Sequence, residues 1–130
     1  METYNPKKIN LIVNGWYITG FADGTFISAE RNEDGRVPNV GAHGDVVITE
    51  SSDATGTVTV TLNQTSPSVR ELRDLAKNGT IFPVQLVDAN TQTVRAGGTQ
   101  AAILRTPGLE YGDEVGSVEI PIFVADFDIN

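Results

Sequence analysis

The chain begins with two apolar, β-prone runs separated by a dipeptide typical of tight turns. Residues 8–13 and 16–21 are rich in aliphatic and aromatic side chains, and an Asn-Gly pair lies between them. Asn-Gly favours a type I′ turn because both central residues of that turn need a positive φ. The pattern therefore predicts an antiparallel hairpin, and the two-residue turn sets a register in which Val13 lies opposite Trp16.

A stretch without apolar periodicity follows the third predicted strand, which spans residues 25–31. Residues 32–44 contain clustered Gly, Pro, Asn and Asp, whereas most connections in a compact domain are only about 4–6 residues long. The segment also carries Val37 and Val40, which a fully solvated loop would have little reason to contain. We therefore expect a long protruding loop at residues 32–44 that docks onto another surface.

Alternation with a period of two marks the next part of the chain. Residues 45–50 and 56–63 predict a second hairpin, in which Thr57, Thr59 and Thr61 alternate with apolar neighbours. Successive side chains of a strand point to opposite faces of the sheet. One face of this strand should therefore be buried, and the other should present a neutral row of hydroxyl groups.

One segment carries the signals of an α-helix. Ser66 is a typical N-cap followed by proline, and Gly79 is typical of the residue just beyond a helix C-terminus. Apolar residues between them recur at helical spacing, while Arg70, Arg73 and Asp74 occupy the polar side. The pattern predicts an amphipathic helix of about three turns that lies against the sheets.

Strands return after the helix, at residues 80–88, less regularly at 91–106, and at 118–124. This order of strands, one helix and further strands contains neither a repeat nor a linker. It predicts a single domain over residues 1–130 that is mainly β. The expected architecture is an antiparallel β-sandwich or partly closed β-barrel with one α-helix.

The charge balance limits the partners of the chain. Nine Lys and Arg residues stand against 17 Asp and Glu residues, which gives a net charge of −8. Attraction to nucleic acid phosphates or to an anionic membrane surface needs clustered cations, so neither drives binding here. No apolar run approaches the ~20 residues of a membrane span. We also expect no signal peptide, because the N-terminus lacks a cationic start followed by an apolar stretch.

Candidate catalytic and metal-binding residues are few. The chain has no cysteine, and His43 is its only histidine, so the usual ligand sets for zinc cannot be assembled. Glu30, Glu50 and Glu119 could face one another as paired carboxylates, but acidic residues on exposed strand faces are ordinarily solvated. The nucleophile motif Gly-x-Ser-x-Gly does not occur. We therefore expect no catalytic residue, no cofactor, no metal and no enzymatic activity.

Trp16 and Tyr17, beside the first turn, are candidates for a contact surface. Tyr and Trp are enriched in protein contacts because they combine an apolar body with a polar group. The alternative is that Trp16 packs onto Val13 in the core. The sequence leaves both interpretations open.

Several runs of residues are similar to those of a known protein family. They span residues 8–24, 27–34, 40–45 and 59–68, and they include Val-Asn-Gly-Trp-Tyr-Ile-Thr-Gly-Phe and Val-Gly-Ala-His-Gly-Asp. Together with the chain length, the single helix and the long loop, they resemble the tail tube proteins of contractile-tailed bacteriophages. The resemblance covers most of the chain, although no single motif in it is chemically diagnostic.

The resemblance implies a structural virion protein of the tail tube that is synthesised in the host cytoplasm. Its copies would form hexameric rings stacked into a tube, through which genomic DNA passes as cargo without being bound. The other partners would be a sheath protein, a baseplate and a tape-measure protein, with no membrane involved. The runner-up is a ring-forming secretion-system tube protein of the same fold. More remotely, the chain would be a sugar-binding β-sandwich.

Three sets of site residues follow from the resemblance and from charge. In such proteins the long loop reaches a neighbouring subunit or ring, and the residues given this role are Arg31, Arg36, Val37, Val40 and His43. A conduit for DNA should offer its cargo no cationic group. The residues expected to line its lumen are Glu50, Thr57, Thr59 and Thr61. The helix residues expected to face a sheath are Arg70, Arg73 and Asp74.

Overall fold

The computed structural model describes residues 4–108, 112–114 and 116–129 of the chain. The predicted first hairpin is present and follows a short 3-10 turn at Pro6–Lys8. β1 (Ile9–Val13) pairs with β2 (Trp16–Tyr17), and Val13 lies opposite Trp16, which confirms the predicted register. The two turn residues have φ angles of 53° and 83°, as a type I′ turn requires.

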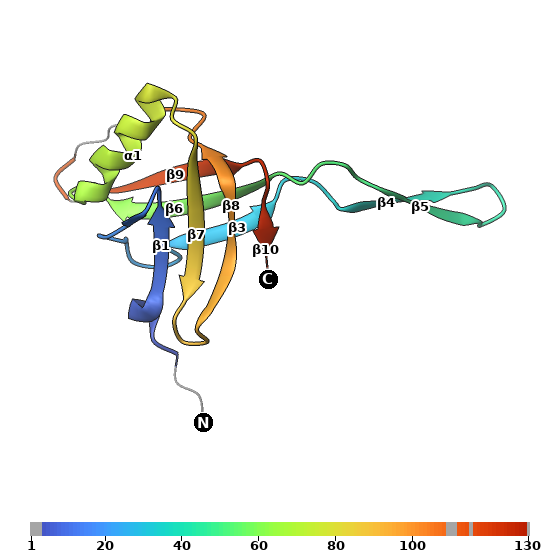
Figure 1. Cartoon of the computed structure of the whole chain (residues 1–130), viewed down its shortest axis with the longest axis horizontal. Helices are drawn as coiled ribbons and strands as arrows, with labels where there is room; N and C mark the ends of the chain where they lie inside the picture. Colours follow the sequence, from blue (N-terminus) through green and yellow to red (C-terminus); the bar gives the residue numbers. More distant parts are fainter. Residues whose placement is uncertain (1–3, 109–111, 115, 130) are drawn as a thin grey trace.

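The remaining strands form one large antiparallel sheet and one small one. They are β3 (Ile27–Arg31), β4 (Arg36–Val40), β5 (Val46–Glu50), β6 (Gly56–Asn63), β7 (Phe82–Asp88), β8 (Thr93–Ala102), β9 (Ser117–Val124) and β10 (Asp128–Ile129). The main sheet has the order β2-β1-β7-β8-β9-β6-β3, with β10 beside β8, while β4 and β5 pair with each other (Figure 1). Among the described residues, β2 and β3 end the order without meeting, so the sheet that these strands form is not closed into a barrel.

The mainly β, antiparallel fold class with a helix is confirmed, but the pairing of the central strands differs from the prediction. β5 pairs with β4, and β6 pairs with β3 and β9, so the predicted hairpin between residues 45–50 and 56–63 is wrong. Residues 36–40 form β4, so the expectation of irregular structure throughout residues 32–44 is also wrong. Alternation shows which side chains share a face, but it does not identify the neighbouring strand.

The predicted helix forms with the predicted boundaries. α1 (Pro67–Asn78) follows the N-cap Ser66 and ends at Gly79, whose φ of 64° makes a left-handed C-cap. Its apolar side, which includes Val69 and Leu72, is buried against the sheet. Among the residues that the structure describes, no helix has the length and apolar character needed to cross a membrane.

The chain that follows β2 is tied to the start of α1, and β2 itself is shorter than predicted. The Ile18 N–H still donates to the Leu11 carbonyl oxygen at 2.9 Å, so bonding to β1 continues one residue beyond Tyr17. The Ser66 hydroxyl donates to the Thr19 carbonyl oxygen at 2.5 Å, and the Thr19 N–H donates to Ser68 Oγ at 3.0 Å. Backbone groups of alternate residues point away from the partner strand in an antiparallel pair, so Thr19 bonds to the helix start and ties α1 to the first hairpin.

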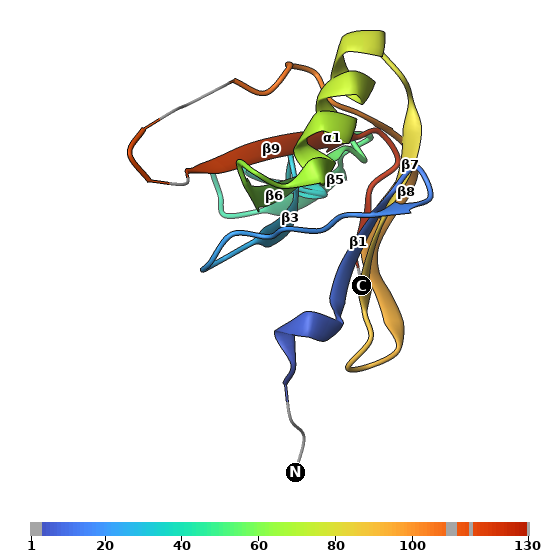
Figure 2. The ribbon, with the colours of Figure 1, turned by 90° about the vertical axis from the view of Figure 1, so that its left-hand side faces the viewer.

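The core lies between the inner face of the curved sheet and α1 (Figure 2). β6 illustrates the principle, because Val58, Val60 and Leu62 are fully buried while the residues between them face outward. Burial of each such side chain contributes about 1.5–3 kcal/mol. Other large and fully buried side chains are Leu11, Leu72, Phe82, Ile120 and Ile122.

Candidate assembly interface

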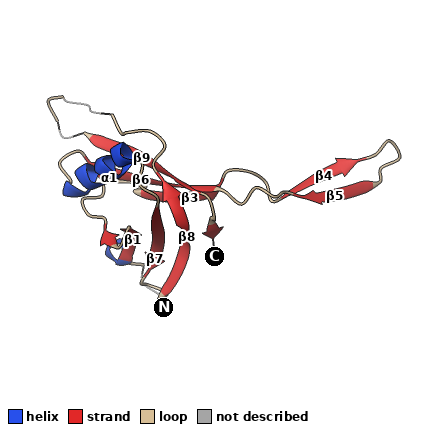
Figure 3. Cartoon of the chain, turned by 45° about the horizontal axis from the view of Figure 1, so that its top comes forward, coloured by secondary structure: helices blue, strands red, loops and turns tan. Residues whose placement is uncertain are grey.

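The β4–β5 hairpin projects from the main sheet as a two-stranded ribbon (Figures 1 and 3), and we call its residues Arg36–Glu50 the arm. Every residue of both strands is exposed. Side chains of paired residues share a face of the ribbon. One face therefore carries an apolar stripe, which consists of Pro38, Val40, Val46 and Ile48.

The arm contains local order but no core of its own. The Gly41 N–H donates to the Asp45 carbonyl oxygen at 2.7 Å and closes the tip. Val40, Val46 and Ile48 nevertheless expose 70%, 58% and 58% of their surfaces. A lone two-stranded ribbon is at best marginally stable in water, and contiguous exposed apolar groups mark interaction sites. These features make the arm the leading candidate for an assembly interface.

Polar side chains brace the root of the arm, where β3 leads into β4 and β5 leads into β6. Asn32 Nδ2 donates to Thr55 Oγ1 at 3.1 Å, and Thr57 Oγ1 donates to Asn32 Oδ1 at 2.6 Å. The Asp53 carboxylate accepts bonds from the Thr55 hydroxyl and N–H, which hold the pKa of Asp53 below its ordinary value. These bonds fix the direction in which the arm leaves the sheet.

Phe127 packs against the same root from the C-terminal side of the fold. Its side chain is 3% exposed and lies against Gly56, where any Cβ would collide with the ring. The Phe127 N–H donates to the Ala54 carbonyl oxygen at 3.1 Å. The Arg31 guanidinium lies 5.9 Å from the centroid of the ring, in cation–π distance. Arg31, expected to contact a neighbour, thus packs at the root of its own arm.

The other expected contact residues lie on the arm itself. Arg36 begins β4, Val37 and Val40 lie on opposite faces of the ribbon, and His43 lies in the turn at the tip. Arg36 pairs across the ribbon with Glu50. Glu50, grouped with the threonines in the sequence prediction, is therefore part of the arm and separate from the threonine row.

The threonine row occupies the outward face of β6. Thr57, Thr59 and Thr61 are half-buried, and on their face Glu30 lies opposite Thr57 while Glu119 lies opposite Thr61. The two glutamates are thus offset by about 13 Å along β6 at the rise of a strand, too far for a pair of catalytic carboxylates. Within the described residues of β3, β6 and β9, this face also carries Pro121 and Phe123 beside its carboxylates and hydroxyls, but neither Lys nor Arg.

The helix residues expected to face a sheath differ in their surroundings. Arg70 and Asp74 are exposed, whereas Arg73 is half-buried. Arg73 Nη2 donates to the Gly108 carbonyl oxygen at 3.3 Å, so this side chain holds the segment after β8 to the helix. Arg70 and Asp74 therefore remain the residues of this set that are available to a partner.

The two aromatic residues beside the first turn lie at the margin of the fold. Trp16 shares a face with Val13 but exposes 49% of its surface, and Tyr17 exposes 63%. The alternative that Trp16 packs inside the core is therefore wrong, since a core residue would be largely covered. Both rings are available for contact with another molecule.

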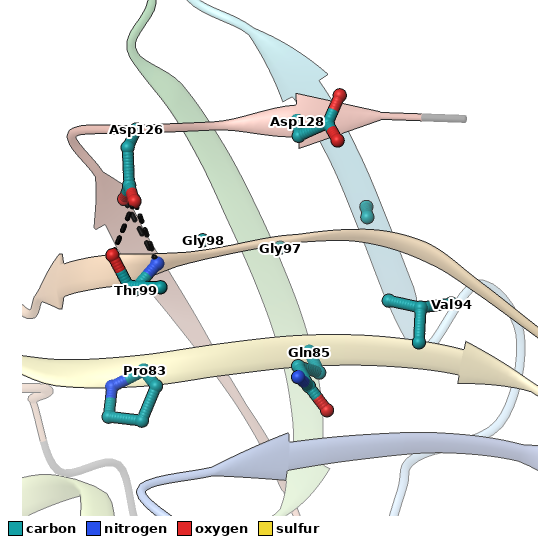
Figure 4. A pocket seen from close by; sticks show the side chains of 9 residues that line it. Pro83, Gln85, Val94, Gly97, Gly98, Thr99, Asp126 and Asp128 are labelled. Carbon is teal, nitrogen blue, oxygen red and sulfur yellow. Dashed lines mark hydrogen bonds between the residues drawn. The ribbon is translucent and has the colours of Figure 1, made fainter.

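A shallow pocket of about 300 Å³ beside β7, β8 and β10 contains a carboxylate with a strongly lowered pKa (Figure 4). Asp126 accepts hydrogen bonds from the Thr99 hydroxyl at 2.5 Å, the Thr99 N–H at 3.0 Å and the Gln100 N–H at 2.9 Å. These bonds lower its pKa from 3.8 to about 2. The same bonds satisfy the Thr99 and Gln100 N–H groups of β8 in the gap between β9 and β10. Asp126 therefore has a structural role that no sequence motif indicated.

The described residues also lack the arrangement that metal binding would need. In this part of the chain, no three or more His, Cys, Asp or Glu side chains come together in a way that could hold a metal ion. Asp126 and Asp128 both line the shallow pocket, but the Asp126 oxygens accept bonds from Thr99 and Gln100. The feature that points to contacts between proteins is the exposed arm.

Comparison with known proteins agrees with this interpretation. A family model described as "Bacteriophage PhiTE tail tube protein" matches residues 13–129. No curated protein sequence matches the chain. The family match spans most of the chain, including the arm and its root.

Solved structures share the fold at low sequence identity. A chain of "Virion of native gene transfer agent (GTA) particle" aligns with a TM-score of 0.64 and 14% identity, covering 98% of this chain and 99% of that one. The sheath/tube terminator of an extracellular contractile injection system aligns with a TM-score of 0.63 and 10% identity, covering 100% and 98%. The tube-terminating cap of the anti-feeding prophage aligns at 0.54 and 9%, covering 100% and 92%.

Proposed function

Because this chain belongs to the bacteriophage PhiTE tail tube protein family, we propose that its copies assemble into hexameric rings that stack to form the inner tube of a contractile tail. The chain is a structural component of a phage tail, and its place is in the virion. We assign it no enzymatic role. Residues 1–130 act as one tube domain, made in the host cytoplasm before the tail is built.

The exposed arm is the observation that carries this proposal. Its apolar stripe has no covering partner among the described residues, while its root is held firmly by Asn32, Asp53 and Phe127. A projection with a rigid base and an apolar surface is suited to engage another subunit. Arg36, Val37, Val40 and His43 make this contact in the proposed assembly.

The threonine row is the proposed wall of the lumen. DNA is a polyanion, so a wall of hydroxyls flanked by Glu30 and Glu119 offers its phosphates no cationic partner. Repeated around a ring and along a stack, these carboxylates keep the passing DNA away from the wall. A structure of the assembled tube in which Thr57, Thr59 and Thr61 face the sheath would refute this assignment.

Further partners follow from the place of the protein in a tail. The exposed charges of Arg70 and Asp74 on α1 form the proposed surface for the sheath protein. Baseplate and tape-measure proteins contact the tube at its end and in its lumen. DNA passes as cargo, and no membrane contact is involved.

The alternative is a ring that ends a tube instead of forming it. Two of the similar structures are terminators or caps of contractile injection systems, and they share this fold. Negative-stain electron microscopy of the purified protein separates the possibilities. Long tubes of even diameter support the tube protein, isolated rings support the terminator, and a persistent monomer contradicts both and revives a monomeric binding module.

A further inference from the structure

The open side of the main sheet contains a cleft of about 500 Å³. Its apolar lining comes from Ile9 of β1, Phe26 just before β3, Ile27 of β3 and Leu86 of β7, all of them only half-buried, and the exposed ring of Tyr4 lies beside them. Ile27 and Leu86 also pack against the core. The cleft is therefore where the core reaches solvent because the sheet does not close.

A free strand edge borders this cleft. β3 ends the strand order, so within the described residues one of its edges pairs with no strand. β1, on the other side, does not offer such an edge, because Leu11 accepts from the Ile18 N–H and the Ile9 N–H donates to the Pro6 carbonyl oxygen. Free strand edges accept a strand from another chain by backbone hydrogen bonding. A β-ribbon with an apolar face would match both the lining of the cleft and its β3 edge.

The arm is such a ribbon, but it points away from the cleft of its own copy. The cleft lies beside Ile27, the first residue of β3, whereas the arm continues from beyond Arg31, the last residue of β3. Figure 1 shows the arm leading outward from the body of the molecule. The arm that occupies the cleft must therefore come from another copy.

We propose that the cleft receives the apolar stripe of the arm of a second copy. This proposal rests on the proposed self-assembly and names the surface that receives the arm. Asp88 and Arg95 also line the cleft, and Arg36 and Glu50 lie on the same face of the arm as the stripe. On the arm these two charges lie at the root end of the stripe. Each surface thus combines apolar side chains with one cation and one anion, which allows two opposite-charge pairs across the contact.

Charge complementarity matters here because the copies repel one another overall. Each chain has a net charge of −8, so contact between copies needs local attraction and apolar burial to offset this repulsion. The contact is also head-to-tail, since each copy gives one arm and offers one cleft. Such contacts generate rings or open helical assemblies, and a ring or a tube is built in this way.

Cysteine cross-linking tests the contact, and only the introduced thiols can react because the chain itself has no cysteine. Val46→Cys places a thiol on the stripe, and Thr25→Cys places one at the exposed mouth of the cleft. The matched control combines Thr25→Cys with Val47→Cys, since Val47 is 64% exposed on the other face of the arm. Both double variants and all three single variants are treated with a short bis-maleimide and separated on denaturing gels.

A head-to-tail contact links each copy to the next, so Val46→Cys/Thr25→Cys should give a ladder of covalent dimers, trimers and larger species. The single variants should give dimers at most, and the control should give no ladder. Absence of the ladder, or an equal ladder from the control, overturns the proposal. All altered side chains are exposed, and circular dichroism verifies that the variants fold.

Electron microscopy of the same samples keeps this test separate from that of the proposed function. Tubes without the ladder would contradict the proposed cleft contact and support the proposed tube function. A ladder without tubes or rings would support the cleft contact and contradict the tube function. The absence of both the ladder and any assembly would contradict both proposals.

Discussion

Phe127 offers a direct test of how the arm is anchored. Its side chain is 3% exposed, lies against Gly56 and faces the Arg31 guanidinium. Replacing a buried Phe by Ala costs about 3–5 kcal/mol, and this includes lost contacts and the cavity left behind. Phe127 lies in a short connection between β9 and β10 that can relax into the space. We therefore expect Phe127→Ala to lower the free energy of unfolding by about 3 kcal/mol, at the low end of that range.

Urea denaturation followed by circular dichroism measures this loss of free energy of unfolding. In thermal unfolding followed by the same signal, Tm should fall by about 10 °C for a chain of this size. Phe123→Ala is the matched control, because Phe123 is half-buried on the outer face of β9. It removes the same ring and should cost about 1 kcal/mol. Equal losses in the two variants would refute the view that Phe127 locks the root of the arm.

Three further predictions follow from the structure. The pKa of Asp126 is about 2 in the fold and 3.8 ordinarily, so its carboxylate stabilises the fold above about pH 4 and this stabilisation is lost as the pH falls towards 2. Asp126→Asn should weaken that acid dependence in urea titrations, and an unchanged dependence would contradict the assigned bonds. The Ser51 N–H donates to the Gly35 carbonyl oxygen at 2.9 Å across the root of the arm, so a short turn can replace Arg36–Glu50 there. A Gly-Gly replacement should leave a monomer that is folded by circular dichroism and that forms no tubes in electron micrographs. Normal tubes would show that assembly does not need the arm. Changing Thr57, Thr59 and Thr61 to Lys should give tubes that retain double-stranded DNA in low-salt co-sedimentation, unlike the parent protein, and tubes that retain none would place the row outside the lumen.

Local signals were sufficient to predict the elements whose structure depends on neighbouring residues. Asn14 and Gly15 have the positive φ angles that their residue types favour, and Gly79 ends α1 in the left-handed conformation. The alternation along β6 correctly separated its buried valines from Thr57 and Thr59. These features rest on contacts within a few residues, so the sequence displays them directly.

Other features depend on residues that are distant in the chain. Phe127 packs against Gly56 and Arg31, and Asp126 bonds to Thr99, yet none of these residues belongs to a recognisable motif. The same limit explains the errors in strand pairing, because nothing in residues 45–50 shows that their partner is β4 and not β6. For the same reason, the sequence prediction groups Glu50 with the threonine row although it lies on the arm.

The sequence by itself determined the strand faces, the first turn, the helix and its caps, and the resemblance to tail tube proteins, because periodicity and turn chemistry are local properties. Only the tertiary structure decided that residues 32–55 form a braced root and a projecting arm, and that the sheet stays open beside a cleft. Strand partners are chosen by the packing of the whole core, which no single segment encodes. The surfaces through which copies of this protein are proposed to meet are therefore products of the fold.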